Sequence, residues 1–287
     1  MATDVQQFIE TKQFSSEEIT SRTREIYETI LHESEHIDGG NFTRIHPDDA
    51  ERLFDLYDGL FFDGGSRKLL GDISLNFRLS KRMTQTGGKA GRRELRDHSG
   101  KVVGTEYEIA VSTTLLFGTF QEDHRPILMS GIECRDRLEA LQRVVEHEMT
   151  HLIEMLIWVD SSCSAPRFQS IANRFFGHTD HRHQLITPRE QAFTKFGIKP
   201  GDRVSFRLDG QHHVGLVNRI TKRATVLVEN ENGECYSDGK RYSKFYVPVG
   251  MLELIENRLI PSTSRLSSRW SFAIRWKIFT ASTCRPA

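Results

Sequence analysis

The chain has 287 residues, of which 37% are hydrophobic and 27% charged, with a formal net charge of zero. This length can bury a substantial core, and no segment approaches the roughly 18 consecutive apolar residues of a membrane-spanning helix. The N-terminus has neither the basic nor the apolar region of a signal peptide, and the four cysteines form no CxxC pair. We therefore expect a soluble, cytoplasmic protein without membrane contact or a disulfide framework.

The balanced net charge conceals an uneven distribution along the chain. Residues 1–60 carry 14 acidic and 5 basic side chains, whereas residues 80–101 carry seven basic and two acidic ones. The segment 256–287 has six basic residues and one acidic residue. Either basic segment could contact a polyanion such as DNA.

Two helices are predicted in the N-terminal part of the chain. Ser15 or Ser16 can cap the first, SSEEITSRTREIYETILHES, whose first turn carries glutamates. Asp48 or Asp49 can cap the second, HPDDAERLFDLYDGLFF, in which apolar residues recur at helical spacing. We expect residues 1–45 to form a helical appendage to the domain that follows.

Residues 72–80 (DISLNFRLS) and 105–112 (TEYEIAVS) alternate apolar and polar side chains, which predicts two strands. The stretch between them is rich in Gly and Arg, and we expect a long basic loop there. Its position ahead of a strand that borders a cleft makes it a nucleic-acid candidate, the alternative being ordinary solvent-exposed charge. The candidate residues are Lys89, Arg92, Arg93 and Arg96.

A long amphipathic helix is predicted for residues 135–158, followed by the polar turn DSSCSAP. A shorter helix, 166–176, begins at Pro166 and is closed by Gly177. We place the end of this α+β domain, 46–196, near Phe196.

Short β-type runs separated by Gly, Asn and Asp follow, and they predict a small barrel over residues 197–257. The pattern resembles SH3-like or KOW-type barrels, which host nucleic-acid or protein contacts without fixing either. Basic residues and tyrosines near its predicted turns could form a nucleic-acid surface or a solvated rim. The remaining basic tail, 258–287, is expected to be disordered.

The most informative motif is EHEMTH, which places His147, Glu148 and His151 in the HExxH pattern on the long helix. Four helical residues return to nearly the same face, so both imidazoles can bind one zinc ion. Glu148 lies beside them and can act as general base towards water, as peptide hydrolysis requires. The apolar flanks VV and LIEMLIW bury this turn, and a metal ion would satisfy its polar side chains.

The residues after the motif restrict the choice of a third ligand. Metzincins are excluded because Glu154 and Ile157 stand where their glycine and histidine should be. Glu154 also lies about 10 Å along the helix from His147. We therefore interpret Glu154 as an ordinary polar helix residue.

Four segments in this order resemble the SprT-like zinc metalloproteases: LFDLYDGLFF, ISLNFRLS with KRMTQTGG behind it, YEIAVSTTLL and the HEMTH helix. The resemblance covers residues 46–186. It implies a minigluzincin-type fold, endopeptidase activity on proteins attached to DNA, and a third ligand histidine in an HGxxF-like element. Here Ser164 stands at that histidine, while Phe168 keeps the aromatic residue.

Two residues could replace the missing histidine. Cys163 adjoins Ser164, and the following helix N-terminus is expected to lower the pKa of its thiol. An antiparallel return of the chain after the long helix would instead bring His178 level with His151. We favour His178, and the two exclude each other because a helix about 16 Å long separates them. The nearby His181 and His183 could orient a ligand, assist an oxyanion or be plain surface histidines.

The sequence thus predicts a zinc endopeptidase with Glu148 as its base. Two alternatives remain open. In the first, loss of the histidine at position 164 has impaired catalysis and the barrel acts as a nucleic-acid- or protein-binding module. In the second, the same site hydrolyses small peptides and has no DNA partner.

Overall fold

The computed structural model describes residues 2–121 and 125–255, which form an α+β protein as expected. The chain divides into two compact units after Ile186. This division precedes the predicted boundary near Phe196, because helix α8 (Pro188–Phe196) places Ala192 in the core of the second unit. The predicted tail 258–287 lies outside the described residues. Within those residues, no helix combines the length and apolarity needed to cross a membrane.

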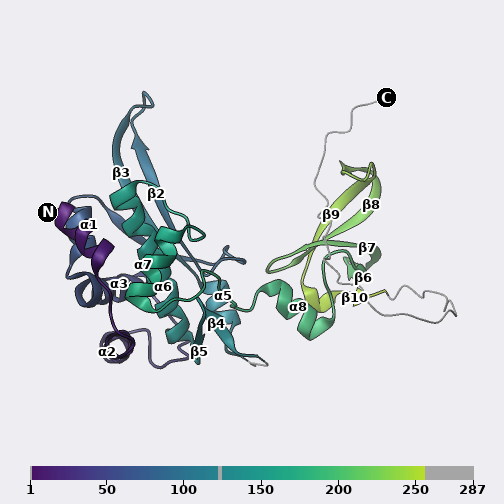
Figure 1. Cartoon of the computed structure of the whole chain (residues 1–287). Coiled ribbons are helices and arrows are strands. Elements are labelled where there is room, and N and C mark those ends of the chain that lie inside the picture. The colour runs from purple at the N-terminus through teal and green to yellow at the C-terminus, as the bar shows by residue number, and fades with distance from the viewer. Residues whose placement is uncertain (1, 122–124, 256–287) are drawn as a thin grey trace, which may run out of the picture. The chain divides into compact units, whose positions relative to one another are not determined.

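The N-terminal helices α1 (Ala2–Thr11) and α2 (Ser16–Glu33) lie in the first unit (Figure 1), and apolar side chains of both helices belong to its core. Ser15 caps α2 in a reciprocal pair with Glu18, as the sequence predicts. The buried side chains on and beside these helices include Ile9, Phe14, Ile26 and Ile30. Residues 1–45 are therefore not an appendage, since their apolar side chains complete the core.

Helix α3 (Pro47–Phe62) is followed by the short helix α4 (Gly65–Leu70). The N-cap of α3 is His46 and not Asp48 or Asp49, so the predicted cap was wrong by two residues or more. Asp49 completes this cap by accepting a hydrogen bond from the backbone N–H of His46 at 2.6 Å.

A three-stranded sheet, ordered β1-β3-β2, adjoins α3 and α6 (Figure 1). Its strands are β1 (Leu75–Ser80), β2 (Gly88–Arg96) and β3 (Val102–Ser112). β3 pairs in parallel with β1 and antiparallel with β2. The long basic loop predicted between β1 and β3 is therefore wrong, because strand β2 lies within that stretch.

After α5 (Thr113–Gly118), a small hairpin of β4 (Ile127–Met129) and β5 (Ile132–Cys134) leads into α6 (Arg137–Trp158). Asp136 caps α6 through the N–H of Glu139. Helix α7 (Pro166–Phe176) begins at the predicted proline and ends at Gly177, whose φ of +70° suits glycine. The buried face of α6 crosses the core and carries the HExxH motif.

In the second unit, α8 is followed by an antiparallel sheet in the order β10-β6-β7-β8-β9, and Val249–Met251 form a 3₁₀ turn. Its strands are β6 (Arg203–Leu208), β7 (Gln211–Ile220), β8 (Ala224–Cys235), β9 (Arg241–Val247) and β10 (Glu253–Leu254). Over residues 125–255 the two end strands do not pair with each other, so the sheet is not a closed barrel. Three tyrosines lie near the predicted turns: Tyr236 and Tyr242 are buried, whereas Tyr246 is exposed, which argues against a surface on which all three stack against bases.

Candidate metal and catalytic site

Both motif histidines project from α6 towards the start of α7. Their ring centroids lie 4.9 Å apart, and Phe168 on α7 packs against His147 at 4.8 Å and against His151 at 4.5 Å. Phe168 is fully buried, so one rigid aromatic ring fixes the positions of both imidazoles. The aromatic residue singled out in the sequence therefore supports the motif.

Cys163, in the turn before α7, completes a group of three potential ligands. The ligand atoms of His147, His151 and Cys163 all lie within 4.8 Å of one another. A tetrahedral zinc ion separates nitrogen and sulfur ligands by roughly 3.4–3.7 Å, so a movement of about 1 Å or less would bring these side chains to the separation that an ion requires. Two imidazoles and a thiol are a donor set that suits zinc and leaves a fourth position open.

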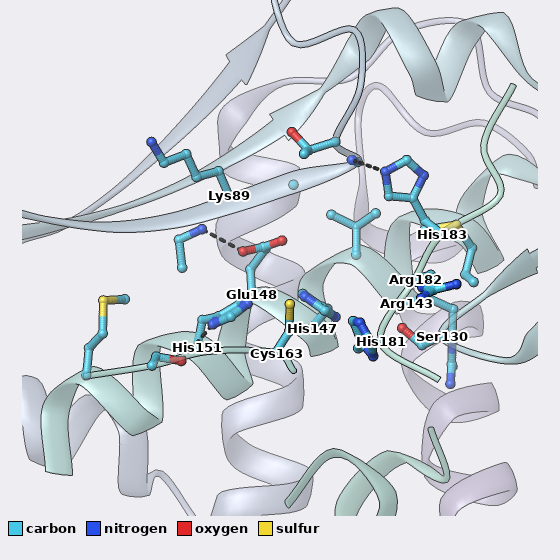
Figure 2. A pocket seen from close by; sticks show the side chains of 18 residues that line it. Lys89, Ser130, Arg143, His147, Glu148, His151, Cys163, His181, Arg182 and His183 are labelled. Carbon is cyan, nitrogen blue, oxygen red and sulfur yellow. Dashed lines mark hydrogen bonds between the residues drawn. The ribbon is translucent and has the colours of Figure 1, made fainter. Parts of the chain in front are cut away.

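Glu148 is buried between α6 and β2 and faces the same pocket (Figure 2). The backbone N–H of Ala90 on β2 donates a hydrogen bond to its Oε2 at 2.6 Å. A Cβ atom at Gly88 would lie 2.6 Å from the other carboxylate oxygen, so strand β2 can pass this close only with glycine there. The edge strand thus aims the carboxylate into the pocket.

Burial dominates the electrostatics of the site. It lowers the pKa of His147 to about 3, with a further contribution from His151, and it also lowers the pKa of His151. Both imidazoles are therefore neutral near pH 7, the form that binds metals. Burial raises the pKa of Glu148 to about 8 against the opposing hydrogen bond from Ala90, which is typical of a functional carboxyl group.

The pKa of the Cys163 thiol is raised, chiefly by burial and further by the charges of Glu148 and Glu154. The expectation that the following helix lowers this pKa was therefore wrong. A thiol of this kind becomes a thiolate when a cation displaces its proton, which is the usual behaviour of zinc-binding cysteines.

His178, the favoured third ligand from the sequence, is not brought to this group. Its Nε2 lies 2.7 Å from a carboxylate oxygen of Glu146, and Arg143 pairs with the other oxygen at 3.0 Å. Glu146 immediately precedes His147 and points about 100° away around the helix axis. All three side chains are almost fully buried, and they form a network of polar contacts that does not include the three potential ligand atoms.

Ser164, which occupies the place of the expected histidine, is exposed, and its hydroxyl contacts that of Ser162 at 3.0 Å. His181 and His183 both line the pocket, which has a volume of about 340 Å³. The backbone N–H of Gly87 donates to Nε2 of His183 at 3.1 Å, so this histidine holds the segment that leads into β2 (Figure 2). His183 is therefore more than a plain surface residue.

The four basic candidates all lie on β2, but they differ in their contacts. Arg93 is paired with Glu106, and Arg96 is paired with Glu94 at 2.6 Å. Lys89 lines the pocket, and neither its side chain nor that of Arg92 forms an ion pair within the described ranges. Lys89 at the pocket and Arg92 further along β2 thus carry positive charge without an ion-pair partner among the described residues.

Sequence reasoning missed the hydrogen-bond partners of His151. Its Nδ1 lies 2.7 Å from the hydroxyl of Ser161, which in turn donates to Glu154 at 2.6 Å. Glu154 is fully buried, although it had been interpreted as an ordinary polar residue. Glu154 lies seven residues after His147, which is too far along the helix for both to bind one ion. It does lie close enough to contact Ser161 in the turn that follows α6.

Comparison of this chain with models of known families, with characterised proteins and with solved structures gave no match. Its function must therefore be argued from the site itself.

Proposed function

We propose that this protein is a zinc-dependent endopeptidase of the SprT-like type, with the metal held by His147, His151 and Cys163. The observation that carries the proposal is the convergence of these three ligand atoms next to the buried Glu148 in one open pocket. Zinc supplies a Lewis acid that lowers the pKa of water to about 7 and favours the charged form of a neighbouring carboxylate.

The remaining steps would be carried out by side chains of the protein. Glu148, held by Ala90, accepts a proton from the attacking water and returns it to the leaving amine as the peptide bond breaks. The rings of His147 and His151 stay in place against Phe168 while this occurs. β2 forms one wall of the pocket, so a substrate would approach along this edge of the sheet.

The decisive experiment compares the full-length protein with its Glu148→Gln variant. The glutamine should leave one zinc ion bound per chain but reduce cleavage of an unstructured protein by about 100-fold or more, because an amide cannot accept the proton. Glu139→Gln, on the same helix outside the pocket, is the matched control and should retain activity. Retained cleavage in Glu148→Gln would contradict the mechanism. Zinc binding without any cleavage by the unmodified chain would favour the impaired-enzyme alternative.

We further propose that the preferred substrates are proteins attached to DNA, with Lys89 and Arg92 contacting the DNA. The support is that Lys89 lines the pocket, that Arg92 lies on the same strand β2, and that neither forms an ion pair among residues 2–121 and 125–255. The double variant Lys89→Ala/Arg92→Ala should lower the slope of log affinity against log salt by up to about two, since each phosphate contact releases about one counterion.

The matched control for this test is Arg93→Ala/Arg96→Ala, which removes the same charge from residues that already have glutamate partners. It should change the slope less than the first pair does. Cleavage of a short peptide should persist in both variants. An unchanged salt slope in Lys89→Ala/Arg92→Ala would remove DNA from the proposal and favour a small-peptide hydrolase.

A further inference from the structure

A continuous series of short polar contacts runs from α7 to Glu154 on α6, through the turn after α6, and ends on the candidate ligand His151. Nδ1 of His151 lies 2.7 Å from Oγ of Ser161, and this hydroxyl lies 2.6 Å from Oε2 of Glu154. Arg167 on α7 donates from Nε to the other carboxylate oxygen at 2.7 Å. The Arg167 guanidinium also lies over the Trp158 ring, 4.6 Å from its centroid. Ser161, Glu154 and Arg167 are therefore each held by contacts on two sides.

The directions of these hydrogen bonds follow from counting protons. Arg167 can only donate, and a carboxylate facing it can only accept. The single proton of the Ser161 hydroxyl must therefore go to Glu154. The serine oxygen is then left to accept, so Nδ1 of His151 carries the ring proton.

A neutral histidine with its proton on Nδ1 has its free electron pair on Nε2. This is the nitrogen that remains available to a metal, because Ser161 occupies the other one. His147 offers a contrast within the same site. In the described ranges it makes no hydrogen bond, and its ring is positioned by packing against Phe168.

We propose that Ser161 and Glu154 are positioning residues that hold His151 in the tautomer whose Nε2 binds the metal, with Arg167 fixing the carboxylate. The inference rests on the proposed metal site. A carboxylate next to a ligand histidine is a common arrangement in zinc proteins, and here a serine hydroxyl lies between the two groups. The turn after α6 would thus have two roles in the site: Cys163 supplies a ligand, and Ser161 orients the ligand His151.

The first test measures zinc affinity of the full-length chain by competition with a chromophoric chelator. Ser161→Ala should weaken binding by roughly 10- to 100-fold, the usual effect of removing such a partner. Ser162→Ala is the matched control, because this neighbouring serine contacts Ser164 and not the histidine. It should bind zinc within about twofold of the unmodified protein. Equal affinities of the two variants would overturn the inference.

Glu154→Gln provides a second variant of nearly unchanged shape. Arg167 would hold the amide oxygen, so the amide nitrogen would donate to Ser161 and the hydroxyl would donate to Nδ1 of His151. The imidazole proton should then move to Nε2, and zinc affinity should fall at least as far as in Ser161→Ala. Unchanged affinity in Glu154→Gln would contradict the relay.

The tautomer itself can be read from long-range ¹H–¹⁵N spectra of the metal-free full-length chain, with His151 assigned through His151→Gln. The unmodified protein should show the proton on Nδ1, and Glu154→Gln should show it on Nε2. A proton on Nε2 in the unmodified protein would overturn the inference. Because this measurement needs no metal, it is distinct from failure of the proposed function, which would appear as a chain that binds no zinc.

Discussion

Individual residues decide the identity of the third ligand, and two substitutions separate the candidates. Cys163→Ser should reduce bound zinc per folded chain as far as His151→Ala does, because a hydroxyl is a poor zinc ligand. His178→Ala should leave zinc bound but lower stability by roughly 1–3 kcal/mol, since Glu146 loses a buried hydrogen-bond partner. Zinc content by atomic emission and thermal unfolding monitor the two effects. The opposite ranking would return the role to His178.

The sequence predicted part of this site because part of it is local. His147, Glu148 and His151 share one helix, so their spacing alone places them together. The choice between Cys163 and His178 depended on the path of the chain after Trp158, which no local pattern specifies. Glu154 and Ser161 were missed for the same reason, since their contact with His151 exists only after the turn has folded back.

Among the elements, β2 departs most from the sequence prediction. Its segment, GKAGRRELR, lacks the alternation and the β-branched residues of a typical strand, and most of it is exposed. The segment is a strand because it pairs with β3, although its own residues have low strand propensity. Helices α6 and α7 were predicted within about two residues, because apolar periodicity, Pro166 and Gly177 mark them locally.

The close approach of β2 to α6 makes a prediction about two glycines on that strand. An alanine Cβ at position 88 would lie 2.6 Å from the Glu148 carboxylate and 2.7 Å from Val144, whereas nothing lies within 4 Å at position 91. Gly88→Ala should therefore destabilise the protein by about 1–3 kcal/mol and reduce cleavage, as overpacking displaces Glu148. Gly91→Ala is the control and should be neutral or slightly stabilising. Thermal melts and a protease assay would show the contrast, and equal behaviour would argue against the tight packing of β2.

At the scale of the whole molecule, the sequence separated a mixed N-terminal part from a β-rich C-terminal part, but placed both ends of the first domain incorrectly. Helical periodicity identified α2 without showing what its apolar face covers. The aromatic contacts of Phe14 with Phe61 and Phe175 join segments distant in the chain. A pattern along the sequence does not show such contacts, which is why it predicts residues 1–45 as an appendage.

These contacts predict how the chain can be divided. A fragment of residues 1–186 should fold and bind zinc as the full chain does, because it contains one complete hydrophobic core. A fragment of residues 46–196, the domain predicted from the sequence, should not fold, since removing Ile9, Phe14, Ile26 and Ile30 uncovers that core. Each buried side chain of this size contributes about 1.5–3 kcal/mol, and the sum approaches the stability of a typical domain. Circular dichroism and zinc content of the two fragments test the division, and a folded, zinc-binding 46–196 fragment would contradict it.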